Sequence, residues 1–403
     1  MNQTPQSNRL HVAIFGETNA GKSALFNALL GADMAIVSEV SGTTTDPVSR
    51  SMEFLPYGPI VLVDTAGIND RSLLGQNRME KTRAVIDRTN YALYAADPES
   101  FDAKEYERLK EEWGKRKVPH KLVWTKCDVR DRLQVAEFLK QYPESVAISV
   151  YDNQTIGALK AVVSKELEVL AQEDESLIGG LLAPGSTVVM VVPVDSEAPK
   201  GRLILPQVQF IRDCLDHGIG CMVTTPADLG RTLDQVVKAD LVVTDSQAFH
   251  LVKEIVPEDV LLTSFSILMA RQKGDIRTLM EGIQATRNLK DGDKVLISEV
   301  CVHNRTHEDI GHVKIPAMLK KVTGKALVFD FASGRDFKNL TDYKLIVHCG
   351  GCMVTGKEME NRIRQAAESG IPITNYGIAL AYGSGILERS IRILERELEG
   401  VAG

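Results

Sequence analysis

The sequence predicts an α/β protein whose sheets are mainly parallel, and three observations lead to this class. Apolar runs of strand length alternate with amphipathic helical stretches along nearly the whole chain, which is the pattern of parallel sheets covered by helices. The first apolar run leads into a glycine-rich loop and then a helix, the order in which phosphate-binding loops (P-loops) occur. The 403 residues are also enough for two or three separate cores. We therefore expect an N-terminal P-loop domain followed by two smaller α/β domains.

Composition limits the classes of function. Apolar residues make up 44% of the chain and charged residues 25%, which is ordinary for a globular protein. No apolar run has the length of a membrane span, and Met1–Asn8 lacks the apolar core of a signal peptide. We therefore expect a cytoplasmic protein without a membrane partner. The net charge of −7 creates no general field for nucleic acid, and we expect none as a partner.

The first element is a phosphate-binding loop. Leu10–Phe15 has the pattern of a buried strand, Gly16–Ser23 fits G-x-x-x-x-G-K-[ST], and a helix is expected over Ser23–Leu30. Backbone amides of such a loop surround the phosphates, its lysine reaches the β and γ oxygens, and its hydroxyl ligates magnesium. The loop residues expected at the nucleotide are Gly16, Asn19, Ala20, Gly21, Lys22, Ser23 and Ala24, with Ser23 also at magnesium.

Two later segments have the composition of nucleotide switches. Gly42–Asp46 reads G-T-T-T-D and resembles a first switch. The expected strand Pro59–Val63 ends in D-T-A-G, which fits D-x-x-G, where the aspartate holds magnesium through water and the glycine N–H senses the γ-phosphate. The residues expected at the nucleotide are Thr43, Thr44, Thr45, Asp64 and Gly67, and those expected at magnesium are Thr45 and Asp64.

A further pair of loops favours guanine as the base. The expected strand Lys121–Trp124 ends in T-K-C-D, which fits N-K-x-D with threonine in the first place. In that pattern the aspartate pairs with the guanine N1 and N2 donors and the lysine stem covers the base. Ser149 and Val150 follow the strand Ser145–Ile148 and fit the weaker fifth loop. From these loops we expect Thr125, Lys126, Asp128, Ser149 and Val150 at the base, and the loops in series predict a GTPase domain.

Two residues bear on the rate of hydrolysis. Ile68 follows Gly67 where many regulatory GTPases carry the water-orienting glutamine, so intrinsic hydrolysis should be slow. Asn19 and the G-T-T-T-D segment resemble the potassium-activated GTPases of the TrmE and Era types, in which the matching asparagine helps to hold K⁺. A turn residue that satisfies loop N–H groups is the alternative for Asn19. The expected catalytic residues are Lys22, Asn19 and Gly67.

Changes in composition divide the rest of the chain. An acidic stretch and two glycine-containing turns indicate a linker between Lys165 and Ser186, so we expect domains over 8–172, 184–274 and 275–400. The middle domain shows no catalytic motif and reads as an assembly module in which Cys214 and Cys221 are core thiols. In the last domain we expect helices over His312–Val322 and Ser384–Glu399.

A cysteine and histidine motif lies in the last domain. C-x-H at Cys301 is followed, after His303 and 44 residues, by H-C-x-x-C. Each half follows a strand-like run, Lys294–Ser298 or Tyr343–Val347, and both would lie at strand carboxyl ends, where open α/β sheets place their sites. Three thiols and two imidazoles suit zinc or an iron-sulfur cluster. The candidate ligands are Cys301, His303, His348, Cys349 and Cys352, whereas His307 and His312 read as exposed loop residues.

In this order, a P-loop GTPase, a middle domain without chemistry and a C-x-H…H-C-x-x-C domain resemble the FeFe-hydrogenase maturation GTPase family of the HydF type. The resemblance covers essentially the whole chain. It implies GTP, Mg²⁺ and K⁺ at the first domain and a 4Fe-4S cluster on Cys301, Cys349 and Cys352. It also implies dimerisation through the middle domain, and carriage of a transient di-iron precursor of the H-cluster, made with two radical-SAM maturases and delivered to apo FeFe-hydrogenase.

Two other readings share parts of this pattern. A potassium-activated GTPase of tRNA modification or ribosome assembly would have the same first domain, but should add a basic RNA surface, against which the pI near 5.7 argues. A zinc-stabilised GTPase regulator would fit the ligand count of the cysteine motif, because three Cys and one His suit tetrahedral zinc.

Overall fold

In the computed structural model, residues 9–31, 48–65, 75–172, 176–194, 201, 203–300, 310–333 and 340–399 are described. The chain forms two compact units, Met1–Asp174 and Glu175–Gly403. Within the described helices, none has both the length and the apolar character that crossing a membrane requires.

The first unit is built on a six-stranded sheet in the order β2-β3-β1-β4-β5-β6. Only β2 runs antiparallel to its neighbour; the other pairs are parallel. The strands are β1 (Leu10–Gly16), β2 (Val48–Phe54), β3 (Gly58–Asp64), β4 (Tyr91–Ala96), β5 (His120–Trp124) and β6 (Val146–Ala147). The helices are α1 (Lys22–Gly31), α2 (Gly75–Ile86), α3 (Ala103–Lys115), α4 (Arg132–Gln141) and α5 (Asn153–Gln172).

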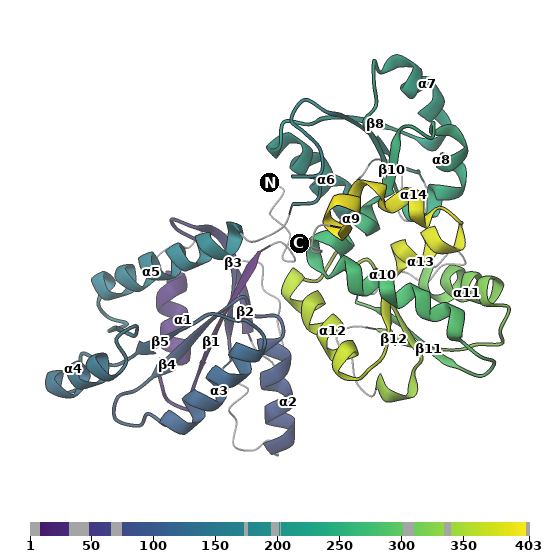
Figure 1. The fold of residues 1–403 in the computed structure, drawn as a ribbon. Coiled ribbons are helices and arrows are strands. Elements are labelled where there is room, and N and C mark those ends of the chain that lie inside the picture. Colours follow the sequence, from purple (N-terminus) through teal and green to yellow (C-terminus); the bar gives the residue numbers. More distant parts are fainter. Residues whose placement is uncertain are drawn as a thin grey trace. The chain divides into compact units, whose positions relative to one another are not determined.

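Both faces of this sheet are covered. Val12 and Ile14 of β1 pack with α1 and α5, whereas Ala13 and Phe15 pack with α2 and α3. The helices and the sheet between them are labelled in Figure 1. Side chains of a strand alternate between its two faces, so an uninterrupted apolar run such as β1 must be buried on both sides. The burial of β1 places the loop that follows it at the carboxyl edge of the sheet, between β3 and β4.

The second unit contains two parallel four-stranded sheets, ordered β10-β9-β7-β8 and β12-β11-β13-β14. The strands are β7 (Thr187–Val191), β8 (Gly220–Thr224), β9 (Leu241–Thr244), β10 (Leu261–Ser264), β11 (Lys294–Glu299), β12 (Val328–Ser333), β13 (Leu345–His348) and β14 (Ile373–Asn375). One apolar cluster, from Leu177 to Leu394, runs through both sheets without interruption. The two halves of this unit therefore share a core.

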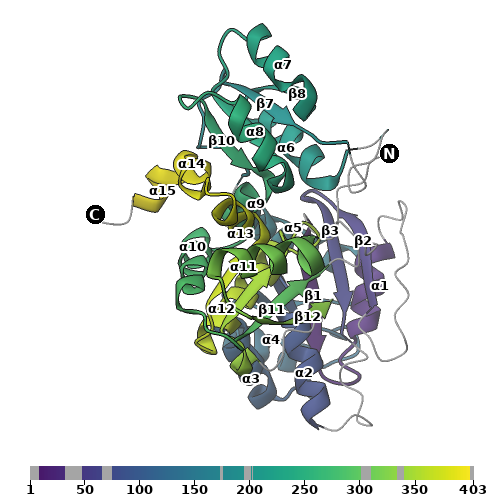
Figure 2. The same ribbon diagram turned by 90° about the vertical axis from the view of Figure 1, so that its right-hand side faces the viewer.

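Helices surround both sheets (Figure 2). With the first sheet are α6 (Leu205–Asp216), α7 (Leu229–Gln235), α8 (Phe249–Ile255) and α9 (Phe265–Lys273). With the second are α10 (Ile276–Gln284), α11 (Ile315–Thr323), α12 (Gly356–Glu368), α13 (Tyr376–Gly383), α14 (Leu387–Ile391) and α15 (Glu395–Glu399). The helix expected over His312–Val322 begins instead with a π-helical turn, Ile310–Lys314, before α11. Helix α9 was not predicted from the sequence.

The prediction of a single C-terminal helix over Ser384–Glu399 is wrong. Asn375 caps α13 through its side chain, which accepts from the Ile378 N–H, so a helix starts well before the expected position. It then stops because Gly385 has a φ of +70°, a conformation that glycine adopts without strain. The chain resumes as α14 and α15.

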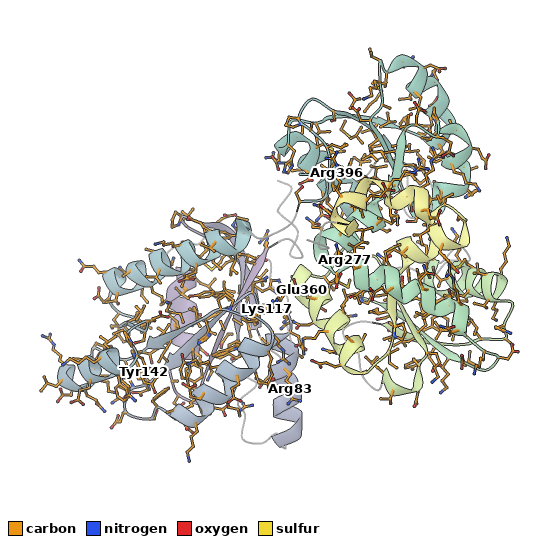
Figure 3. All side chains as sticks on the ribbon, viewed as in Figure 1. Arg83, Lys117, Tyr142, Arg277, Glu360 and Arg396 are labelled. Atoms are coloured by element: carbon orange, nitrogen blue, oxygen red, sulfur yellow. The ribbon has the colours of Figure 1, made fainter. Side chains whose placement is uncertain are left out.

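The C-terminal helices return to the other half of the unit. Arg389 of α14 is buried and donates to the carbonyl oxygens of Val256, at 2.8 Å, and Pro257, at 2.6 Å, beside β10. Arg277 of α10 donates to the Glu397 carbonyl oxygen at 2.6 Å, and both Arg277 and the α15 residue Arg396 are marked in Figure 3. These bonds join segments more than 100 residues apart in the sequence, so the last residues stabilise both sheets.

Candidate functional site

The loop after β1 has the backbone of a phosphate-binding loop. Gly16, with φ of +139°, lies against β4 so closely that a Cβ there would be 2.1 Å from the Ala95 carbonyl oxygen. Only glycine fits this position. Asn19 is exposed and left-handed, with φ of 65°, a conformation that asparagine tolerates better than most residues. The left-handed backbone therefore explains why asparagine suits this turn. The side-chain amide of Asn19 is exposed and is also accessible to a cation.

Lys22 lies folded back onto this loop. It is buried, and its Nζ donates to the carbonyl oxygen of Gly16 at 2.9 Å and to that of Glu17. Burial lowers the pKa of Lys22, while the carboxylates of Asp64 and Glu17 oppose that shift. The loop carbonyl oxygens thus hold the ammonium at a place where a phosphate can replace them as its hydrogen-bond acceptor.

Ser23 and Asp64 meet beside Lys22. Ser23 Oγ donates to Asp64 Oδ2 at 2.8 Å, although the two residues come from α1 and from the end of β3. A hydroxyl and a carboxylate are hard oxygen donors of the kind that Mg²⁺ prefers. Two of the three residues predicted at magnesium are therefore adjacent in the structure, and their binding of the ion stays a prediction. Thr43, Thr44, Thr45 and Gly67 lie outside the described residues.

Thr125 connects the phosphate loop to the expected guanine loop. Its buried Oγ1 donates to the Ala20 carbonyl oxygen at 2.7 Å and lies 3.2 Å from that of Ala96. Gly21 also packs on Thr125, since a Cβ on Gly21 would be 3.5 Å from its side chain. A threonine in the first place of the N-K-x-D pattern can therefore hold the two loops together directly.

Lys126 and Asp128 follow on the same loop. Lys126 has φ of 56°, and its Nζ bonds Asp97 Oδ2 at 3.0 Å, whereas Asp128 is exposed. Arg130 also donates two hydrogen bonds to Asp97, from Nε to Oδ1 at 2.8 Å and from Nη2 to Oδ2 at 2.6 Å. Burial raises the pKa of Asp97, but hydrogen bonds from Arg130, the Glu99 N–H and Lys126 outweigh it and lower the pKa to about 2. Asp97 was not among the sequence-predicted residues, although its place at the end of β4 is a signal.

The fifth loop is held by its own hydrogen bonds. Ser149 donates its N–H to Thr155 Oγ1 at 3.1 Å and accepts at Oγ from the Tyr151 N–H at 3.2 Å. Ser149 is buried and Val150 is partly exposed at the end of this turn. The loop therefore stands at the carboxyl edge of β6, in line with the loops after β1, β3 and β5.

The two halves of the cysteine motif lie on neighbouring strands of the second unit. Ser298 of β11 is in register with His348 of β13, and the Cys349 N–H donates to the Ser298 carbonyl oxygen at 2.9 Å. Burial raises the pKa of the Cys349 thiol, while N–H groups of Val300 and Gly351 that hydrogen-bond to it oppose the shift. Val300 directly precedes Cys301 in the sequence, and Cys301 itself lies outside the described residues.

Cys352 follows a tight turn. Gly351 has φ of +66°, and a Cβ there would be 2.5 Å from Met359 Cε, so the turn requires glycine. Cys349 and Cys352 are both partly exposed, and neither is part of a disulfide. Within the described ranges no group of three or more His, Cys, Asp or Glu side chains is placed to hold a metal ion; Cys301 and His303 lie outside those ranges. The two thiols of C-x-x-C have the softness that zinc and iron-sulfur sites prefer, and Cys301 as a third ligand stays a prediction.

His348 has another role in this structure. It is fully buried, its Nε2 accepts from Arg362 Nη1 at 2.9 Å, and its Nδ1 lies 2.7 Å from the Cys349 carbonyl oxygen. Burial lowers the pKa of His348 to about 3, and the Arg362 charge adds to this. The ring is therefore neutral and donates from Nδ1. Because both nitrogens are engaged, His348 in this arrangement has no lone pair for a metal.

The neighbouring His312 is not an exposed loop residue. Its ring stacks on Phe331 at 4.3 Å between centroids, and its Nδ1 lies 3.7 Å from Glu299 Oε2. Tyr376 also reaches this cluster, donating its hydroxyl to Glu299 Oε1 at 2.8 Å. The interpretation of His312 as exposed is therefore wrong, because the π-helical turn after Asp309 carries it inward. His307 lies outside the described residues.

Three stretches of the chain match models of known protein families. Residues 11–126 match the model of the 50S ribosome-binding GTPase family. Residues 177–274 match the Hydrogen maturase F dimerization domain, and residues 277–393 match the Hydrogen maturase F tetramerization domain.

Several curated relatives are similar to the first unit. GTPase Der of Sulfurimonas denitrificans is 39% identical over 23% of this chain and 19% of its own, and GTPase Der of Wolinella succinogenes is 47% identical over 22% and 18%. The tRNA modification GTPase MnmE of Bordetella parapertussis is 35% identical over 38% of this chain and 32% of its own. The chain thus spans about a fifth to a third of the length of these relatives.

The fold of the first unit and the loops at its carboxyl edge define a P-loop GTPase. The second unit adds the two domains that distinguish one group within this class. The chain belongs to the family of hydrogenase maturation GTPases of the HydF type.

Proposed function

We propose that this chain hydrolyses GTP and serves as an iron-sulfur scaffold, which assembles the di-iron subcluster of the FeFe-hydrogenase H-cluster and delivers it to apo-hydrogenase. The observation that carries the proposal is the pairing of β11 with β13, beside which the Cys349 N–H donates to the Ser298 carbonyl oxygen at 2.9 Å. Cys301 follows β11 by two residues in the sequence, so this pairing favours a site built from both halves of the motif, in a chain whose other unit has a nucleotide site.

At the nucleotide site, the chain binds and orients GTP. The phosphates displace Lys22 Nζ from the carbonyl oxygens of Gly16 and Glu17, and the amides of the loop and the start of α1 surround them. Ser23 and Asp64, which bond each other here, would hold Mg²⁺, and the bound ion would neutralise phosphate charge. Asp128 recognises guanine, and Thr125 keeps this loop fixed to the phosphate loop.

Hydrolysis at this site is slow and faster with K⁺. Ile68 provides no hydrogen bond to the attacking water. The exposed, left-handed Asn19 is free to turn its amide oxygen to K⁺ beside the phosphates. Thr43, Thr44, Thr45 and Gly67 close on the γ-phosphate and thereby change the affinity for partners.

At the thiolate site, Cys301, Cys349 and Cys352 hold a 4Fe-4S cluster. N–H groups of Val300 and Gly351 bond the Cys349 sulfur, as is usual for cluster ligands. His348 serves as a buried support that holds Arg362 beside the thiolates. When bound there, the cluster would supply the attachment point for the di-iron precursor.

The assembly is a homodimer formed through 184–274, and it acts in the cytoplasm. Its macromolecular partners are the two radical-SAM maturases and apo FeFe-hydrogenase. The match of residues 177–274 to a dimerization domain supports the first point. Neither the nucleotide site nor the thiolate site requires nucleic acid or a membrane.

The test is an anaerobic preparation of the full chain analysed for iron, sulfide and zinc, together with its visible spectrum. We expect a brown protein with about four irons and four sulfides per chain, and GTP turnover in the same sample. A colourless protein with one zinc per chain and unchanged GTP turnover would contradict the scaffold and favour a zinc-stabilised regulator. Preference for ATP would contradict the role of Asp128.

A further inference from the structure

Lys273, the last residue of α9, reaches the cysteine loop from the other half of the unit. It is only 5% exposed. Its Nζ donates to the carbonyl oxygens of Gly351 at 3.2 Å, Cys352 at 3.3 Å and Val354 at 3.0 Å. An ammonium has three N–H groups, and here each has a carbonyl acceptor. Since lysine is seldom buried so deeply without compensation, the loop conformation and the lysine depend on each other.

Helix α9 packs alongside the cysteine loop from one end of the loop to the other. Near its start, Ser266 lies beside Gly350, where an added Cβ would be 3.6 Å from Ser266 Oγ. At its end, the Lys273 backbone lies beside Gly356, where an added Cβ would be 3.8 Å from the Lys273 Cα. Asn375 Nδ2 fixes the start of α9 by donating to the Ser266 carbonyl oxygen at 3.1 Å. One wall of the loop is therefore a helix of the neighbouring half.

The loop and the helix belong to different parts of the chain. Helix α9 is the last element of residues 177–274, which match a dimerization domain, whereas the loop lies within residues 277–393. The site around Cys349 and Cys352 is thus composed of both.

Resting on the proposed three-thiolate cluster, we propose that Lys273 is a positioning residue that holds the Cys349–Cys352 loop and stabilises the reduced cluster. A trans peptide carries its N–H antiparallel to its C=O, so fixing three carbonyls also fixes the direction of the N–H groups that follow them. Net charge and N–H bonds to sulfur set the potential of a cluster. A buried ammonium beside the loop favours the form with the additional electron.

Arg271 provides a matched control. It lies on the same helix and is 8% exposed. It bonds the Glu397 carboxylate, at 2.6 Å and 2.7 Å, and the Ser176 carbonyl oxygen. Arg271→Met therefore removes a buried cation of α9 that anchors the chain termini of the unit, and it leaves the bonds of Lys273 to the loop in place.

The first measurement is a redox titration of the full-length, cluster-loaded protein with dithionite, followed by the EPR signal of the reduced cluster. We expect Lys273→Met to lower the midpoint potential, by about 59 mV for each tenfold loss in stabilisation of the reduced form. Lys273→Arg, which keeps the charge, and Arg271→Met should both stay near the wild-type potential. Lys273→Gln, which keeps N–H donors without charge, should also lower it and replaces the methionine variant if that does not fold.

The second measurement needs no cluster. Amide hydrogen exchange over Gly350–Thr355 in metal-free protein should be faster in Lys273→Met than in wild type or Arg271→Met. If wild-type protein takes up no iron, the proposed function fails, and the exchange data still decide whether Lys273 holds the loop. If the cluster forms but Lys273→Met and Lys273→Gln keep the wild-type potential, the inference alone is overturned. Equal exchange in all variants also overturns it.

Discussion

Replacing Thr125 with valine should weaken nucleotide binding, because it cuts the bond between the phosphate loop and the guanine loop. Valine keeps the β-branched shape but removes the hydroxyl that donates to Ala20 O at 2.7 Å and lies 3.2 Å from Ala96 O. The site is buried, since Thr125 is 1% exposed, so the carbonyl that loses its donor gains no water in exchange.

A buried group left without its partner costs about 1–3 kcal/mol. We expect the free energy of unfolding of the first unit to fall by this amount. The bond also holds the two loops in the orientation that binds the nucleotide. If the whole loss of about 1–3 kcal/mol appears in the free energy of binding, the Kd for GDP rises by about 5- to 150-fold. The substitution leaves the bond of Lys22 to Gly16 and that of Ser23 to Asp64 in place, so the phosphate site itself should persist.

Thr125→Asn is the matched variant, since it restores the N-K-x-D pattern and returns an N–H donor to the same place. Fluorescence titration with a labelled GDP and urea unfolding should be measured on all three proteins. We expect the asparagine variant to bind close to wild type. Wild-type affinity in Thr125→Val, or equal weakening in both variants, would refute the idea that this side chain joins the loops.

Four other predictions concern Asp97, the phosphate loop and the thiol of Cys349. The pKa of Asp97 is lowered to about 2 from an ordinary value of 3.8, so its contribution to stability is present above about pH 4 and is lost as pH falls toward 2; Asp97→Asn should flatten the acid unfolding curve of the first unit over that range. Lys22→Ala should abolish GTP hydrolysis. Asn19→Ala should remove the advantage of K⁺ over Na⁺ in a phosphate-release assay. Equal wild-type rates in both salts would contradict the proposed role of Asn19 at K⁺. Cys349→Ser should lose the cluster and hydrogenase activation with GTP turnover nearly intact, because the two sites lie in separate units, and a full iron count in this variant would show that the ligand assignment is wrong.

The nucleotide site could be read from the sequence because its information is local. The loop from Gly16 to Ser23 connects one strand to one helix, so the motif and its spacing determine the backbone. The order of D-x-x-G and T-K-C-D along alternating strands placed Asp64 and Thr125 at one sheet edge, because parallel strands share that edge. The sequence could not determine that Thr125 itself bonds Ala20, since this requires the distance between two loops.

The cysteine motif was also evident from residue type, yet the roles of its neighbours were not. His348 has the spacing of a ligand, and only its burial and the approach of Arg362, 14 positions later, reveal that both ring nitrogens are occupied. His312 reads as a loop residue until the π-helical turn stacks it on Phe331. The break in the C-terminal helix depended on the conformation of Gly385, which competes with a helix-favouring sequence around it.

The sequence by itself therefore determined the class of fold, the phosphate loop and the set of thiols, because strand and helix periodicity and short motifs act over a few residues. Only the tertiary structure shows that Lys273 donates hydrogen bonds to a loop 78 to 81 residues away. It also shows that the two sheets of the second unit share one core. Such contacts follow from how buried faces pack, and a buried ammonium acquires its partners only when the chain closes around it.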